Sequence, residues 1–302
     1  MDADNSLERS LKILAKNPVT SKYMSFRPER ALFHYTTQSG LIGILRDRQV
    51  WASQQESLND ESELSYSANF LQDTFNDYHV TRTGMNPVAI TALSYYFERA
   101  DFSEFPLSAF VASFTEDGDL LSQWERYAGP HGYCVGFDAE RLRAVLAESG
   151  RNLTKVVYDT EFQRDLLNEI FDVAFDRLES GAFEEMTEES VERWANIHAT
   201  IARSMSLTFK HPAFEREQEW RSVELLPDER APALEVRPGA FGVVPYLPIP
   251  VSHEIDDSLS DVIIAPTKYE AEAKRAVLLT LRRFNYDVSR VNVHVSRVPL
   301  RV

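Results

Sequence analysis

The chain has 302 residues, a formal net charge of -15 and a single cysteine. A chain of this length folds without a metal or disulfide staple, and one cysteine excludes both a disulfide framework and a cysteine-rich zinc site. The acidic balance opposes non-specific nucleic-acid binding, and we find neither a signal-peptide core nor a run of about 20 apolar residues, so we expect a cytoplasmic protein with no membrane partner.

Helices and strands alternate through the first half of the chain. Residues 1–30 are predicted to form an N-terminal helix, around residues 7–14, and an extended lead-in, "SFRPER", at 25–30. The predicted strands that follow lie at 31–36, 50–54, 107–116, 132–138 and 153–160. The predicted helices lie at 38–49, 57–78, 88–100, 118–129 and 139–149.

The second half begins with a long helical segment, residues 161–207, whose two apolar stripes predict a helical hairpin inserted between strands. Strand character returns over 218–226 and 233–251, and the tail reads strand, helix, strand. No Pro, Gly or Ser-rich linker divides residues 31–302. We therefore expect one α+β domain with a single mixed or antiparallel sheet and a helical insertion at 161–207.

Polar residues end the strand predicted at 31–36, where "HYTT" places His34, Tyr35, Thr36 and Thr37 ahead of a helix. A strand end that faces a loop is a common place for ligand-binding side chains. The alternative is structural: Thr36 or Thr37 caps the helix, and His34 bonds to a backbone carbonyl.

A second polar group is "LNDESEL", with Asn59, Asp60, Glu61 and Glu63. Acids are favoured at a helix N-terminus, and we prefer that explanation for Glu61. A magnesium site would need further carboxylates or phosphates.

A third group lies on the strand predicted at 107–116. Ser113 and Thr115 alternate, so both point to one face and Phe114 points to the other. Paired hydroxyls beside a cleft can hold a ribose or position a carboxylate. Trp124 and Tyr127, three residues apart, are more typical of a core.

The fourth group is acidic. Glu215, Glu217 and Glu219 share one face if their segment is extended, and crowding of three like charges is expected to raise the pKa of at least one. A polar edge strand is the structural alternative. We favour a functional role for this group.

Several well-known sequence motifs do not occur, namely Walker A, G-x-G-x-x-G, H-E-x-x-H and G-x-S-x-G. The single cysteine, Cys134, lies in the middle of a predicted strand, where an inert thiol is expected.

Five motifs occur in the order found in DUF2971, an uncharacterised bacterial family: "HYTTQSGLIGIL", "LNDESE", "SFTEDGDLLSQWERYAG", "GYCVGF" and "FEREQEWR". The chain is identified as a member of this family from about Phe33 to Arg301. Three of its strand segments, His-Tyr-Thr, Ser-x-Thr and Glu-x-Glu, also resemble the three-part active site of ADP-ribosyltransferases. The opening stretch is similar to the start of DNA-targeting ADP-ribosyltransferase toxins and RNA 2′-phosphotransferases. This resemblance implies an ADP-ribosyltransferase-like sheet and NAD as a substrate.

The resemblance also implies site residues. The catalytic candidates are Glu219, Glu217 and His34, and the NAD-binding candidates are His34, Tyr35, Thr36, Trp51, Asn59, Ser113 and Thr115. Cleavage of the nicotinamide glycosidic bond builds positive charge on the ribose, which a carboxylate stabilises.

The implied roles follow from that chemistry. Glu219 would stabilise the ribose cation and Glu217 would orient or deprotonate the acceptor, although the two exchange if the motif is read in the other register. His34 would bond to a ribose hydroxyl. Tyr35 or Trp51 would stack on nicotinamide, while Ser113 and Thr115 would steady Glu219. The motif departs from the arginine-directed enzymes at Phe114, where they have threonine.

Three functions are therefore considered. The first is an NAD-consuming transferase or glycohydrolase, working as a toxin or antiphage effector on a protein or nucleic-acid acceptor, with a homo-oligomer or a neutralising protein as further partners. The second is a non-catalytic module that binds a nucleotide or protein. The third, a metal-dependent nuclease built on Asp60, Glu63, Glu217 and Glu219, is disfavoured by the acidic charge and by the lack of a lysine near those acids in the sequence.

Overall fold

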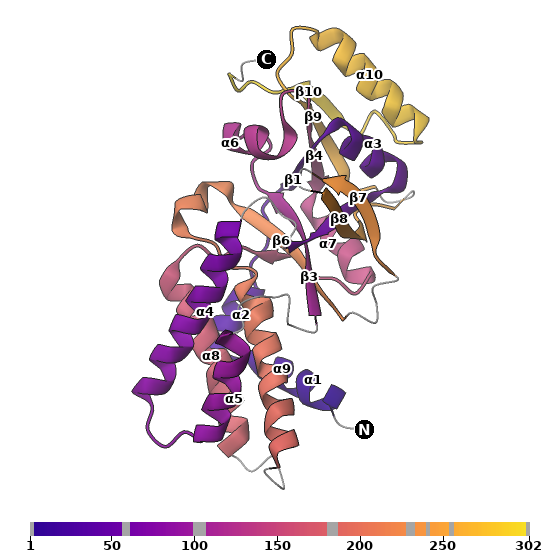
Figure 1. The fold of residues 1–302 in the computed structure, drawn as a ribbon. Helices are drawn as coiled ribbons and strands as arrows, with labels where there is room; N and C mark the ends of the chain where they lie inside the picture. The colour runs from indigo at the N-terminus through magenta and orange to yellow at the C-terminus, as the bar shows by residue number, and fades with distance from the viewer. Residues whose placement is uncertain are drawn as a thin grey trace.

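Figure 1 shows the computed structural model, in which the strands gather in one lobe and most of the long helices in another. The structure describes residues 3–55, 61–98, 107–179, 187–227, 233–239, 242–253 and 257–299. Its strands are β1 (Ala31–Thr36), β2 (Gln49–Gln54), β3 (Leu107–Thr115), β4 (Tyr133–Asp138), β5 (Thr154–Lys155), β6 (Glu219–Pro227), β7 (Glu235–Gly239), β8 (Gly242–Pro250), β9 (Leu259–Ile264) and β10 (Asn292–Val295). Its helices are α1 (Ala3–Leu14), α2 (Pro18–Met24), α3 (Gln38–Asp47), α4 (Glu61–Thr81), α5 (Pro87–Glu98), α6 (Leu121–Gln123), the π-helix η3 (Trp124–Ala128), α7 (Ala139–Glu148), α8 (Thr160–Glu179), α9 (Glu188–Ser206), the 3-10 helix η4 (Pro212–Glu217) and α10 (Glu270–Arg283).

The strands form one sheet in the order β10-β9-β4-β1-β3-β2-β8-β7, and β6 pairs with β3 off this path. The neighbouring strands are antiparallel except for β9 and β10, which are parallel and are joined through α10. A parallel pair needs such a crossover connection, and the strand, helix, strand pattern of the tail predicted it. The predicted α+β class with a mixed, mostly antiparallel sheet is therefore confirmed.

The sheet lobe has its own core, built because alternate residues of each strand face the same side. Leu32, Phe114, Val135 and Trp220 are each at most 1% exposed and belong to this core, which α3, α7 and α10 complete. Phe114 points into it, away from the face that carries Ser113. The core thus fixes the strands whose opposite face forms the site.

The helical lobe has a separate core, which includes Phe75, Leu93, Phe171 and Trp194. The segment predicted as a hairpin at 161–207 forms α8 and α9. The structure adds that α4 and α5, from between β2 and β3, and the N-terminal α1 and α2 pack with this hairpin (Figure 1). Among the helices that the structure describes, none combines the length and apolar character that a membrane span requires.

One helix was not predicted, and one strand is shorter than predicted. The helix α2 lies between the predicted helix and the extended lead-in, and it begins at Pro18, a residue favoured at the first helical position. The strand predicted at 153–160 is reduced to β5, and Val157 instead makes an isolated bridge to Phe209.

A carboxylate of α8 holds the start of α2. Glu169 accepts hydrogen bonds from the backbone N–H groups of Val19 and Thr20 and from the Thr20 hydroxyl, each at 2.8 Å. Helix N-termini need such acceptors because their first N–H groups have no partner within the helix. Glu169 therefore fastens the N-terminal segment to the helical lobe.

Replacing Glu169 with glutamine is expected to lower the free energy of unfolding by about 2 kcal/mol, because charged acceptors form the stronger hydrogen bonds. Urea denaturation measures this change. Asp165→Asn is the matched control, since Asp165 is an exposed acid on the same helix. Equal stability of the two variants would contradict the anchoring role.

Candidate functional site

The sheet opens along one edge of β3. β2 pairs with β3 at Val111 and Phe110, whereas β1 meets β3 only at Thr115. Between these two contacts the backbone carbonyl of Ser113 accepts a hydrogen bond from Nδ1 of His34, at 2.9 Å. The His34 imidazole thus takes the hydrogen bond that a backbone N–H of a neighbouring strand would otherwise make to Ser113. On either side of it, β1 and β2 each pair with a different part of β3.

A cavity of about 480 Å³ lies at this opening. That volume is within the range of small-molecule sites, which span about 300–1,000 Å³. Of the residues predicted for the site, the cavity is lined by His34, Tyr35, Thr36, Trp51, Ser113, Thr115, Glu217 and Glu219. Asn59, which was also predicted, lies outside the described residues, as does Asp60. Three segments distant in the chain therefore meet at one cavity.

The two glutamates do not share a strand face. Pro212 begins the 3-10 helix η4, which ends at Glu217, and Gln218 then adopts a left-handed conformation with φ 43° before β6 begins at Glu219. This turn directs both carboxylates inward, whereas Glu215 is exposed. The condition for a shared face, an extended segment from Glu215 to Glu219, is therefore not met, and Pro212 was the sequence signal against it.

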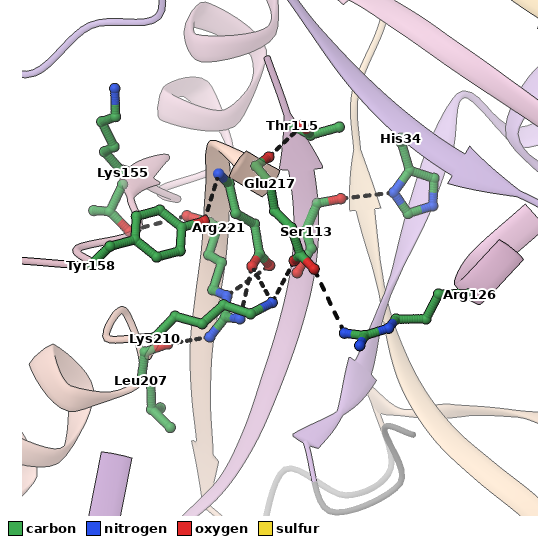
Figure 2. A network of polar contacts seen from close by, with 12 residues as sticks. His34, Ser113, Thr115, Arg126, Lys155, Tyr158, Leu207, Lys210, Glu217 and Arg221 are labelled. Carbon is green, nitrogen blue, oxygen red and sulfur yellow. Dashed lines mark hydrogen bonds and ion pairs between the residues drawn. The ribbon is translucent and has the colours of Figure 1, made fainter. Parts of the chain in front are cut away.

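Buried cations bind the two carboxylates, and Figure 2 shows Lys210 and Arg221 in this network beside Glu217. Nζ of Lys210, a residue only 1% exposed, donates to Oε2 of Glu217 at 2.7 Å and to Oε2 of Glu219 at 3.1 Å. Arg221 donates to both oxygens of Glu219, at 2.8 and 3.0 Å, and also to the carbonyl of Leu207 at 2.7 Å. The network compensates two charges that burial alone would disfavour.

This network decides the protonation state of Glu219. Burial opposes ionisation of its carboxyl, but the charges of Arg221 and Lys210 outweigh burial and lower its pKa to about 2. The Ser113 side chain acts in the same direction. The prediction that crowding would raise a pKa in this group was therefore wrong for Glu219, because cations separate the acids.

Glu217 is held differently. Its Oε1 lies 3.6 Å from Nη1 of Arg126, which is longer than a hydrogen bond, so only its Oε2 accepts a short bond from Lys210. Oγ1 of Thr115 donates to the backbone carbonyl of Glu217 at 2.5 Å. The sequence analysis had suggested that Thr115 steadies the Glu219 carboxylate. In the structure Thr115 instead positions the Glu217 backbone.

His34 is held in one tautomer. A carbonyl oxygen only accepts hydrogen bonds, so Nδ1 carries the proton and Nε2 of the neutral ring is an acceptor. Burial lowers the pKa of His34, and the charge of Arg237 adds to this effect, against the opposing contact with the Ser113 carbonyl. A neutral imidazole of this kind can accept a hydrogen bond from a ligand hydroxyl.

The other residues of the His-Tyr-Thr segment are largely structural. The Tyr35 hydroxyl donates to the carbonyl of Asp117 and accepts from the N–H of Leu120, and its ring packs edge-on against Trp124. Thr37 caps α3 by accepting from Gly40 N–H at 3.2 Å. Thr37 is therefore the helix cap that the structural alternative described. The Tyr35 ring, which was expected to stack on nicotinamide, packs against Trp124 instead.

Close packing of α3 shapes the same wall. A Cβ on Gly40 would collide with Oγ1 of Thr36, and one on Gly43 would lie 2.9 Å from the Trp51 ring. Glycine therefore lets α3 approach both β1 and β2 at the cavity.

Sequence reasoning missed Lys210, Arg126 and Arg237. Arg126 is carried by the π-helix η3, whose Trp124 donates Nε1–H to Asp119 at 2.9 Å. Irregular helix turns of this type often occur at functional sites. No local pattern identifies these cations, because Arg126 and Arg237 lie on other elements and Lys210 is a single lysine in the irregular segment before η4.

Lys210 also bears on the nuclease hypothesis, which had assumed that no lysine adjoins the acids. Its ammonium lies between Glu217 and Glu219, in the position where a divalent cation would need to bind both. Within the described residues, no group of three or more His, Cys, Asp or Glu side chains is arranged to hold a metal ion.

Comparison with known proteins gives a family but no activity. Residues 123–222 match the family described as protein of unknown function (DUF2971), so the family predicted from the motifs is confirmed over this segment. The matched segment carries Arg126, Lys210, Glu217, Glu219 and Arg221. No curated protein and no solved structure matches the chain.

Proposed function

We propose that the chain is an NAD-consuming enzyme of ADP-ribosyltransferase-like type, with its reaction centre in the cavity between β1, β3 and β6. The observation that carries the proposal is the convergence of His34, Ser113 and a buried carboxylate pair on one cavity. The sequence resemblance requires these three segments to meet, and they come from parts of the chain about 80 to 100 residues apart, as contacts such as His34 with Ser113 and Thr115 with Glu217 illustrate.

The charges of the cavity suit an anionic ligand. Among the described residues that line it are three arginines, Arg126, Arg221 and Arg237, and two carboxylates, and Lys210 bonds to both carboxylates. The local balance is therefore cationic in a chain whose formal net charge is -15. A dinucleotide with two phosphates matches this field.

The reaction breaks the bond between the ribose C1′ and the nicotinamide nitrogen. The bonding electron pair leaves with nicotinamide, and the ribose becomes a cation that an acceptor nucleophile or water attacks. A carboxylate beside the ribose stabilises this charge as it develops, and it takes the proton that the nucleophile loses. Nε2 of His34 supplies the acceptor for a ribose hydroxyl.

We assign the carboxylate at the ribose to Glu217. Both oxygens of the Glu219 carboxylate accept hydrogen bonds from cations, two from Arg221 and one from Lys210, and the Ser113 side chain adds a further contact. In Glu217, by contrast, Oε1 lies 3.6 Å from the Arg126 guanidinium, too far for a short hydrogen bond to it. This assignment reverses the roles first expected for the two residues, and Glu219 then holds Lys210 and Arg221 in place.

The biological role we propose, following the sequence resemblance, is that of a toxin or antiphage effector. Such an enzyme either modifies a protein or nucleic-acid acceptor or hydrolyses NAD⁺. The helical lobe is a large surface adjoining the site and is the natural place for an acceptor or a neutralising partner to bind.

Incubation with NAD⁺ tests the proposal. We expect nicotinamide release, measured by chromatography, in the presence of a bacterial cell extract, and the activity should persist in EDTA because the carboxylates are paired with Lys210. Adenine-labelled NAD⁺ separates the two reactions, since a transferase labels the extract and a glycohydrolase yields free ADP-ribose. Binding of NAD⁺ without release in any extract would instead favour the non-catalytic module.

A further inference from the structure

A second polar cluster lies at the β2 end of the same cavity. Arg237 of β7 reaches across β8 and donates from Nη2 to Oγ of Ser53 at 2.9 Å, with its guanidinium 5.7 Å from the centre of the Trp51 ring. Gln55, directly after β2, lines the cavity beside them. None of the roles considered above uses Ser53 or Gln55, and Arg237 has entered only through its charge.

Two atoms of this cluster are buried without hydrogen bonds. Nε of Arg237 and Oε1 of Gln55 have no partner among the described residues, although Gln55 is only 5% exposed. Buried polar groups are nearly always satisfied, so two orphans facing one cavity indicate a ligand that supplies the missing contacts. The amide can present either its oxygen or its NH₂ by a half rotation.

The charge of the cluster selects the ligand. The carboxylates of the cavity are paired with Lys210 and Arg221, whereas Arg237 has no ion pair with an acid in the described part of the chain. A guanidinium with a fork of N–H donors fits the oxygens of a phosphate, to which it can donate two parallel hydrogen bonds.

We propose that Arg237, Ser53 and Gln55 form a phosphate subsite, which binds a phosphate of a nucleotide whose sugar lies toward Glu217. The proposal rests on the proposed function in taking a nucleotide as the ligand. The phosphate accepts from Nε and Nη of Arg237, from the Ser53 hydroxyl and from the Gln55 amide. The cavity thus has a cationic end for phosphate and a carboxylate end for the sugar.

Calorimetric titration with ADP and with adenosine tests the subsite. We expect ADP to bind the wild type. Arg237→Gln should raise the dissociation constant for ADP by at least about tenfold, because a charge-assisted hydrogen bond is lost. Adenosine, which has no phosphate, should bind both proteins alike. Arg275→Gln removes the same charge from the exposed face of α10 and should leave ADP binding unchanged.

A second variant keeps the test valid if Arg237→Gln does not fold. Gln55→Met removes a buried amide whose oxygen is unsatisfied, so we expect equal or higher thermal stability together with weaker ADP binding. Loss of ADP affinity without loss of stability marks a ligand contact and not a structural one. The proposal is overturned if the wild type does not bind ADP at millimolar concentration, or if both variants bind it as the wild type does.

The outcomes also separate this subsite from the proposed function. ADP binding that depends on Arg237, without any nicotinamide release from NAD⁺, would retain the subsite and reject the enzyme activity. Nicotinamide release with an unchanged KM in Arg237→Gln would retain the activity and reject the subsite. Inorganic phosphate that competes with ADP only in proteins with Arg237 would support the phosphate contact itself.

Discussion

Replacing Glu217 with glutamine is expected to reduce nicotinamide release from NAD⁺ by about 10²- to 10³-fold, the effect of removing one electrostatic contact to a transition state. The amide keeps the size of the side chain but cannot neutralise the ribose cation or accept a proton. Because the lost interaction exists mainly in the transition state, the loss should appear in kcat, with KM little changed.

Glu215→Gln is the matched control for this prediction. Glu215 lies in the same short helix, η4, but its side chain is exposed. Nicotinamide release by this variant should equal that of the wild type. If Glu217→Gln stays active while Glu219→Gln is inactive and still folded, the assignment of the two carboxylates is reversed.

The second large effect concerns stability. Arg221→Met is expected to lower the free energy of unfolding by about 3–5 kcal/mol, because it leaves the carboxylate of Glu219 buried with Lys210 as its remaining cation. The change also removes the hydrogen bond to the carbonyl of Leu207. Chemical denaturation at neutral pH measures the loss.

Arg216→Met is the control, since Arg216 is exposed beside the site and its loss should change stability by less than about 0.5 kcal/mol. Adding Glu219→Gln to Arg221→Met should recover part of the loss, because the uncompensated charge is then removed. An additive or larger loss in the double variant would show that the ion pair is not the cause.

The same pair predicts a dependence on pH. Glu219 has a folded-state pKa of about 2, below the value of about 4.3 for an unperturbed glutamate, so it releases its proton more readily in the folded protein. Its stabilisation is fully present above about pH 5 and is lost as the pH falls toward 2. The difference in stability between wild type and Arg221→Met should therefore shrink over this interval. A constant difference would contradict the low pKa.

The order of elements was accessible from sequence because local patterns determine it. The short segment "ALFHYT" and the helical spacing that follows predicted β1 and α3 closely, and the two apolar stripes of 161–207 predicted α8 and α9. What local patterns do not contain is which helices share a core. The joining of α4, α5, α1 and α2 with the hairpin depends on contacts between residues far apart in the chain.

The candidate site was accessible only in part, for the same reason. His34, Ser113 and the Glu217 and Glu219 pair stand out as chemical groups at strand ends. Lys210 does not, because it is a single lysine in an irregular segment, and only the fold places its ammonium between the two acids. Sequence reasoning therefore found the acids, but it expected a raised pKa where the pKa of Glu219 is lowered.

The most direct test of the account is a crystal structure of the Glu217→Gln protein with NAD⁺. The account predicts that NAD⁺ occupies the cavity, with the nicotinamide ribose against residue 217 and the His34 ring, and with a phosphate on Arg237. NAD⁺ bound to another surface, or a cavity left empty at saturating NAD⁺, would contradict it.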